Sequence, residues 1–173
     1  GTLTDWVDII FGGYKGNYGG FATNWYYQGG SNPLEYADSL FIDNSYVTDI
    51  TIPDGVTNIK RCAFFNYARL QSVKLPNSLK EIGDGAFYGC TSLTSSLSLP
   101  DVISIGQRAF CSTGIQGILN IPHSVTFIGN EAFRSCEGID TLIIGNGVDS
   151  IYDQFEGCSG ITYLQLGSGV KSI

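Results

Sequence analysis

The sequence predicts a mainly β solenoid with short helical turns, made of stacked 22–24-residue units and opened by an irregular N-terminal unit. An apolar residue followed by Pro or Gly recurs in steps of 23, 24, 22, 23 and 22 residues. It is found at Ile52, Leu75, Leu99, Ile121, Ile144 and Leu166. The pair Ala-Phe recurs in step with it, at 63–64, 86–87, 109–110 and 132–133, and Phe155 stands alone in the fifth unit. A fixed period of this length is typical of architectures in which each unit stacks on the next.

Each unit contains two extended segments and one corner. Apolar residues alternate before each Pro or Gly, as in Val73-x-Leu75 and Leu97-x-Leu99, which predicts a strand with one buried face. A V-x-x-I stretch then predicts a second short extended segment, and the A-F-x-x-C stretch a tight helical or turn-like corner. Because no unit can bury its apolar face alone, equivalent residues should form ladders: a Phe ladder, an Ile ladder and a partial Cys ladder.

The repeated pattern is distinctive at several positions at once. It reads I-P-x-x-V-x-x-I-G-x-x-A-F-x-x-C, as in the stretches LPNSLKEIGDGAFYGCTSL and IPHSVTFIGNEAFRSCEGI. Over residues 47–173 this pattern resembles the BspA-like subclass of leucine-rich repeats, found in bacterial surface proteins and in some protists. The resemblance implies a leucine-rich-repeat solenoid, an extracellular or cell-surface location, and adhesion to a host protein or to a protein on a neighbouring cell.

We expect two regions along the chain. Residues 47–173 form the repeat array of about five units, of which the last is truncated. Residues 1–46 form a divergent N-terminal repeat or cap, with an insertion at 12–30. Within it, Phe41-Ile42 and Val47-x-x-Ile50 are expected to be the strands of a hairpin that turns at residues 43–45. The absence of Met and of a signal peptide favours a fragment of a longer protein.

The N-terminal insertion is the first candidate binding site. Residues 11–30 hold seven glycines and seven aromatic residues, a composition typical of adaptable binding loops. Aromatic rings of this kind also stack on sugars, so a carbohydrate ligand is the alternative to a protein. The other interpretation is that the rings fold back and cap the N-terminal end of the core. The candidate ligand-binding residues are Tyr14, Tyr18, Trp25, Tyr26 and Tyr27.

The outward side chains of the main strands are the second candidate. Positions between the buried residues point to solvent and should line up in columns. They are polar in the early units and gain Ile118, Ile143 and Tyr163 in the later ones. An exposed apolar cluster marks a partner site, although β-branched residues also simply suit strands.

The sequence gives little support for nucleic-acid binding, membrane insertion, catalysis or metal binding. A net charge of −7 disfavours nucleic acid, and no apolar run is long enough to insert into a membrane. No catalytic constellation, cofactor motif or metal-ligand cluster is present, and the single His123 occupies a turn position. The odd number of cysteines, five, excludes a complete disulfide framework, and we expect free thiols. Cys62 and Cys111 lie outside the repeat pattern and are expected to be exposed.

Together these observations predict a non-enzymatic protein-recognition or adhesion module. The alternatives are a carbohydrate-binding module that uses the aromatic insertion, or a passive structural spacer. The chain stops at Ile173, before the corner of its unit. We therefore expect the C-terminal end to expose its core and strand edge, which favours end-to-end self-association.

Overall fold

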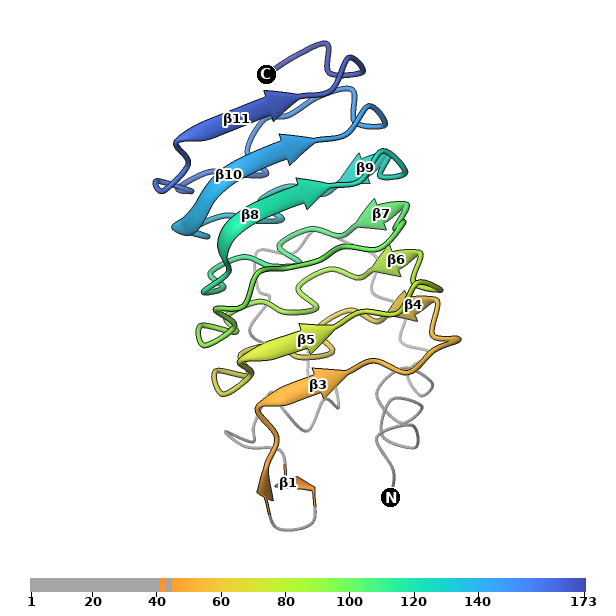
Figure 1. The fold of residues 1–173 in the computed structure, drawn as a ribbon, viewed down its shortest axis with the longest axis vertical. Coiled ribbons are helices and arrows are strands. Elements are labelled where there is room, and N and C mark those ends of the chain that lie inside the picture. Colours follow the sequence, from red (N-terminus) through yellow and green to blue (C-terminus); the bar gives the residue numbers. More distant parts are fainter. Residues whose placement is uncertain (1–40, 43–44) are drawn as a thin grey trace, which may run out of the picture.

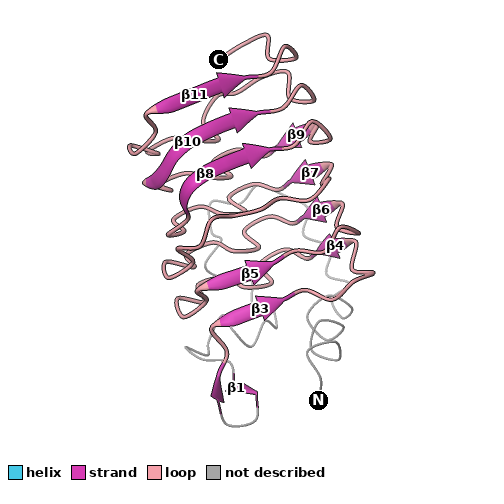
Figure 2. Cartoon of the chain, in the orientation of Figure 1, coloured by secondary structure: helices cyan, strands magenta, loops and turns pink. Residues whose placement is uncertain are grey.

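The computed structural model describes residues 41–42 and 45–173, which form a β solenoid whose turns stack along the long axis (Figure 1). Strands and turns make up all of this part of the chain, and no helix occurs in it (Figure 2). The corners that contain the Ala-Phe pairs are tight turns. The expected insertion at 12–30 lies outside the described residues, as do its five candidate ligand-binding residues.

The main sheet is formed by the strands that precede each Pro or Gly. Its first part pairs β3 (Asp49–Thr51) with β5 (Ser72–Lys74), and its second part pairs β8 (Gln116–Ile121), β10 (Gly138–Ile144) and β11 (Tyr163–Leu166), all in parallel. These strands lie above one another on one side of the solenoid (Figure 1). Buried and exposed residues alternate along β8, as the apolar pattern predicts.

The V-x-x-I stretches form a second, narrower sheet, here called the side sheet. It contains β4 (Asn58–Ile59), β6 (Glu81–Ile82), β7 (Ser104–Ile105) and β9 (Phe127–Ile128), again parallel and in the order of the chain. In every strand the Ile faces the core and the residue before it lies at the surface. The prediction of a second extended segment is confirmed.

The predicted Phe ladder runs through the core. Neighbouring rings of Phe64, Phe87, Phe110, Phe133 and Phe155 stack with centroids 5.0 to 5.3 Å apart and planes within 10° of parallel. The first four rings are fully buried. Since the spacing matches the distance between strands, the repeat period sets both the sheet and the ladder.

Three cysteines occupy one position beside this ladder and act as hydrogen-bond donors. The thiols of Cys90, Cys136 and Cys158 donate to the carbonyl oxygen of the Phe in the preceding unit, over 3.0 to 3.1 Å. In the unit between, Thr113 holds this position, and its hydroxyl donates to the carbonyl of Phe110 in its own unit at 2.9 Å. Each of these carbonyl groups also accepts a backbone N–H, as that of Phe64 does from Tyr67 at 3.1 Å, so the thiols add a second donor to carbonyls inside the core.

Two expectations about local structure were wrong. The hairpin joins β1 (Phe41–Ile42) to β2 (Ser45–Tyr46), whereas residues 49–51 belong to the main sheet as β3. A connection of two residues is the commonest hairpin, and Ile50 is needed in the core, where it is buried. Cys111, expected to be exposed, is buried as well, while Cys62 is half-buried.

Candidate binding surface

The second part of the main sheet presents two large apolar side chains to solvent in one column. The register places Ile118 beside Thr141, and Thr141 beside Tyr163. The side chains of Ile118 and Tyr163 are 57% and 54% exposed. Leu119 and Leu142, which alternate with them along the strands, are buried and anchor β8 and β10 to the core. The sequence therefore predicted the outward direction of Ile118 and Tyr163 correctly.

Ile143 belongs to the neighbouring column. It lies between Asn120 of β8 and Gln165 of β11, and its side chain is half-buried. The three apolar residues predicted from the sequence therefore share one face but not one column. We call this set, Ile118, Thr141, Ile143 and Tyr163, the apolar patch.

The first part of the main sheet is polar. Asp49 accepts hydrogen bonds from the hydroxyl groups of Ser72, on the neighbouring strand, and Thr48. These bonds lower the pKa of the Asp49 carboxyl below its usual range, first through Ser72 and then through Thr48. Lys74 lies beside Thr51 in the same register. The main face thus changes from charged and hydroxylated at β3 and β5 to apolar at β8, β10 and β11.

The side sheet carries exposed apolar residues that the sequence reasoning missed. Phe127 in β9 is 58% exposed, and Ile103, just before β7, is 48% exposed. The signal was available, because Phe127 occupies a position that holds Asn58, Glu81 or Ser104 in the other units. An apolar residue at a surface position of a repeat is conspicuous once the units are aligned.

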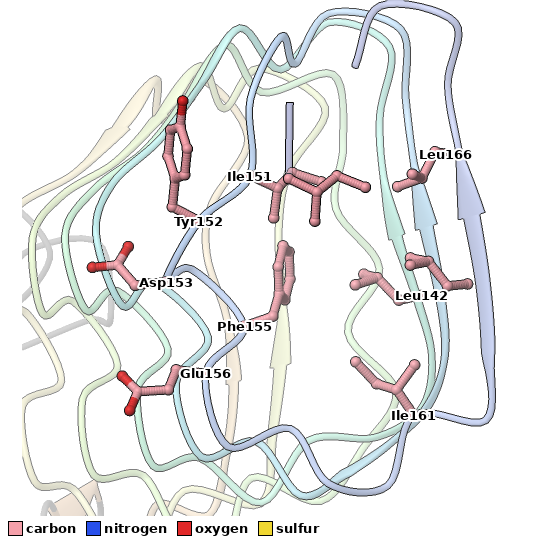
Figure 3. Close-up of a pocket in the computed structure, with 10 residues that line it drawn as sticks. Leu142, Ile151, Tyr152, Asp153, Phe155, Glu156, Ile161 and Leu166 are labelled. Carbon is pink, nitrogen blue, oxygen red and sulfur yellow. The ribbon is translucent and has the colours of Figure 1, made fainter. Parts of the chain in front are cut away.

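A hollow of about 630 Å³ lies over the last ring of the Phe ladder. Figure 3 shows Phe155 at its floor, between Ile151 and the residues Leu142 and Ile161. Leu164 and Leu166 of β11 border it and are half and about one-third exposed, although the strand pattern alone would place them inside. The expectation of an exposed core and strand edge at this end agrees with this geometry, whereas self-association there stays a prediction.

Ion pairs connect the corners of the third, fourth and fifth units. Glu131 accepts from Arg108 at 2.5 Å and pairs with Arg134 at 3.2 Å, and Arg134 reaches Glu156 at 3.6 Å. The hydrogen bond from Arg108 lowers the pKa of the Glu131 carboxyl. These groups neutralise one another across three units.

Four of the five thiols are kept protonated by burial. Burial raises the pKa of Cys90 and that of Cys136 to about 12, and it also raises the pKa of Cys111 and Cys158. A raised thiol pKa keeps the unreactive protonated form at neutral pH. Cys90, Cys111, Cys136 and Cys158 are free thiols. His123 accepts a hydrogen bond from the N–H of Asn146 at 3.1 Å through Nδ1, as suits its turn position.

Within residues 41–42 and 45–173, no group of three or more His, Cys, Asp or Glu side chains is placed to hold a metal ion. The same part of the chain contains no helix with the length and apolar character needed to cross a membrane.

Solved structures with a related fold come from several bacteria. A leucine-rich repeat protein from Bacteroides ovatus is 35% identical, with a TM-score of 0.64 over 68% of this chain and 31% of that one. A leucine rich cell surface protein from Faecalibacterium prausnitzii is 28% identical, with a TM-score of 0.64 over 69% and 32% of the two chains. The T. pallidum leucine rich repeat protein is 25% identical, with a TM-score of 0.58 over 69% and 73%.

The chain spans about a third of the length of the first two of these proteins. A search of curated proteins finds no match. The model of the BspA type leucine rich repeat region matches residues 35–162 in six copies. The repeats, their register and this match together show that the chain belongs to the BspA type leucine-rich repeat family.

Proposed function

We propose that this chain is a non-enzymatic protein-recognition and adhesion module of a bacterial cell-surface or secreted protein, and that the apolar patch contacts its partner. The observation that carries the proposal is the exposure of Ile118 and Tyr163 in one column of a parallel sheet. Apolar side chains held outward by paired strands lose little further freedom on binding, so that their contact area contributes to affinity.

The composition of the patch favours a protein partner. Tyr is enriched at protein interfaces, and Ile118, Ile143 and Tyr163 supply an apolar centre that the neighbouring polar residues Asn120 and Gln165 border. The likeness to a leucine rich cell surface protein supports a location outside the cell. A host protein or a protein of a neighbouring cell is the expected partner class.

The test is a binding screen of the purified chain against arrays of extracellular proteins and of glycans. Capture of a protein with a measurable dissociation constant supports the proposal. Binding to glycans alone would instead favour the carbohydrate-binding alternative and the aromatic insertion at 12–30. Absence of binding to both arrays would favour a passive spacer.

Single substitutions then locate the site. Ile118→Ser and Tyr163→Ser should each weaken binding of the captured protein about tenfold or more, because residues at an interface centre dominate affinity. Phe127→Ser is the matched control, since Phe127 is equally exposed but lies on the side sheet. Equal losses for all three variants, or a loss only for Phe127→Ser, would contradict a site on the main face.

A further inference from the structure

The main sheet is interrupted in its third unit. Within the described residues, the main chain of Ser95–Leu99 forms no backbone hydrogen bond to β5 or to β8. Figure 1 shows this segment passing between β5 and β8 without a strand arrow. The facing edges of β5 and β8 are therefore unpaired in the middle of the solenoid.

The third unit has one extra residue before its Pro and one fewer after it. The step from Leu70 to Leu75 is five residues in the second unit, whereas the step from Leu93 to Leu99 is six in the third. The following unit also has a six-residue step, and there Gly117 takes a φ of 76°. Beside it the register contains a β-bulge, since Gly117 pairs with Ile139 and Ile118 with Thr141, and the pairing of β8 with β10 continues on both sides. The third unit has serines in place of such a glycine, and no strand forms.

The core of the third unit is packed as in its neighbours. Leu97 is buried in the core, and Phe110 stacks on Phe87 with centroids 5.1 Å apart. The side sheet also continues without a gap, since β7 pairs with both β6 and β9. The hydrogen-bond ladder is therefore lost on one side of the solenoid and retained on the other.

We infer that the solenoid flexes at this interruption, with the side sheet as the hinge line. The pair β3–β5 and the group β8–β10–β11 are then two bodies, and the gap between them on the main face opens and closes. Each body keeps its own parallel pairing, whereas no backbone hydrogen bond joins Ser95–Leu99 to either of them. Where the main face is the binding site, which rests on the proposed function, the hinge lets its polar and apolar halves adjust to the shape of a partner.

Distances between spin labels test the hinge on the free protein. Labels carried by noncanonical residues at Thr51 and Asn120 span the interruption, and labels at Asn58 and Phe127 span the intact side sheet. Both pairs bridge three strand spacings, about 14 Å. Dipolar EPR should give a distance distribution about twice as wide for the first pair. Equal widths would overturn the inference.

Deletion of Ser95 is the matched variant. It restores the five-residue step and the spacing L-x-x-L-x-L of the second unit, so residues 96–99 should join β5 and β8. The distance distribution between labels at Thr51 and Asn120 should then become as narrow as that of the side-sheet pair. A width that stays unchanged in a folded deletion variant would overturn the assigned cause.

Amide hydrogen exchange on the unmodified chain independently tests whether the backbone of the third unit lacks hydrogen bonds on the main face. The amides of Ser96–Ser98 should exchange about tenfold or more faster than those of Leu142 and Ile143 in β10. Slow exchange at Ser96–Ser98 would contradict an open ladder. None of these measurements needs a partner, so failure of the binding screen and failure of the hinge are distinguishable.

Discussion

The side-chain amide of Gln154 donates a hydrogen bond to the carbonyl oxygen of Ile128, 3.3 Å away in the preceding unit. In the preceding units the equivalent carbonyl accepts a backbone hydrogen bond. For example, the N–H of Gly129 donates to the carbonyl oxygen of Ile105 at 2.8 Å. The fifth unit is one residue shorter between its Ile and its Phe, so its backbone does not reach. Oε1 of Gln154 accepts from the N–H of Tyr152 at 2.5 Å, and the amide thereby bridges both groups.

Replacing Gln154 by Ala, the residue of the other units, should destabilise the protein. Gln154 is buried, and its removal leaves the carbonyl of Ile128 and the N–H of Tyr152 without this bridge. A buried group without a partner costs about 1–3 kcal/mol, and Tyr152 lies at the surface, so a loss of about 2 kcal/mol is expected from the carbonyl of Ile128. Urea unfolding monitored by circular dichroism measures it.

The control restores the backbone path. Residues 152–154 are replaced by Gly-Asn-Glu-Ala, which is the sequence of residues 129–132. This variant regains the missing residue and should be at least as stable as the unmodified chain, although it also lacks Gln154. If the single change to Ala has no measurable cost, the bridge does not stabilise the fold.

The features that recur in every unit could be predicted from the sequence. The period indicated the strands, the Phe ladder and the outward direction of Ile118 and Tyr163, because each copy reinforces the same pattern. Features that occur once were not predictable in this way. Tyr152 stands where other units have Gly83, Gly106 and Gly129, and a Cβ at Gly129 would lie 2.4 Å from the backbone nitrogen of Gln107. In the fifth unit the shortened path makes room for a side chain there.

The Phe ladder should carry much of the stability. Phe110 is fully buried and stacks on both Phe87 and Phe133. Phe110→Ala should lower the free energy of unfolding by about 3–5 kcal/mol, as truncation of a buried Phe does. Phe127→Ala is the control, because its exposed ring should cost less than about 0.5 kcal/mol. Similar urea midpoints for the two variants would refute the assignment of the core.

At backbone positions with positive φ, introducing Gly should stabilise the protein and removing Gly should destabilise it. Ser135 has a φ of 58°, whereas Gly89 and Gly157 hold the same position in other units with φ of 70° and 74°. A side chain costs about 1–2 kcal/mol in this conformation, partly offset by the greater freedom of Gly in the unfolded chain. Ser135→Gly should therefore stabilise by up to about 1 kcal/mol.

Gly89→Ala is the reverse experiment and should destabilise the protein. Besides the positive φ, its added Cβ would lie 2.3 Å from Oδ1 of Asn66. Thermal unfolding should show a higher midpoint for the Ser135 variant and a lower one for the Gly89 variant. Shifts of the same sign in both would show that the backbone conformation does not govern stability at these positions.

The buried thiols should make the fold sensitive to alkaline pH. Burial raises the pKa of Cys90 from its ordinary value of 9.0 to about 12. The folded state therefore favours the protonated thiol, and the stability that this thiol contributes is fully present below pH 9. Above pH 9 the unfolded chain releases the proton first, so stability falls by about 1.4 kcal/mol per pH unit until the folded thiol also ionises near pH 12.

Cys90→Thr isolates this contribution from the ionisation of other groups, which both proteins share. Thr113 fills the same position in the next unit and donates to the carbonyl of Phe110, so a hydroxyl group suits the site. Urea unfolding between pH 8 and pH 11 should give a shallower decline for the variant, and the difference should begin near pH 9. Cys136→Thr should behave alike, because burial raises the pKa of Cys136 to about 12 as well. Parallel curves for the unmodified chain and both variants would mean that these thiols ionise equally in the folded and unfolded states.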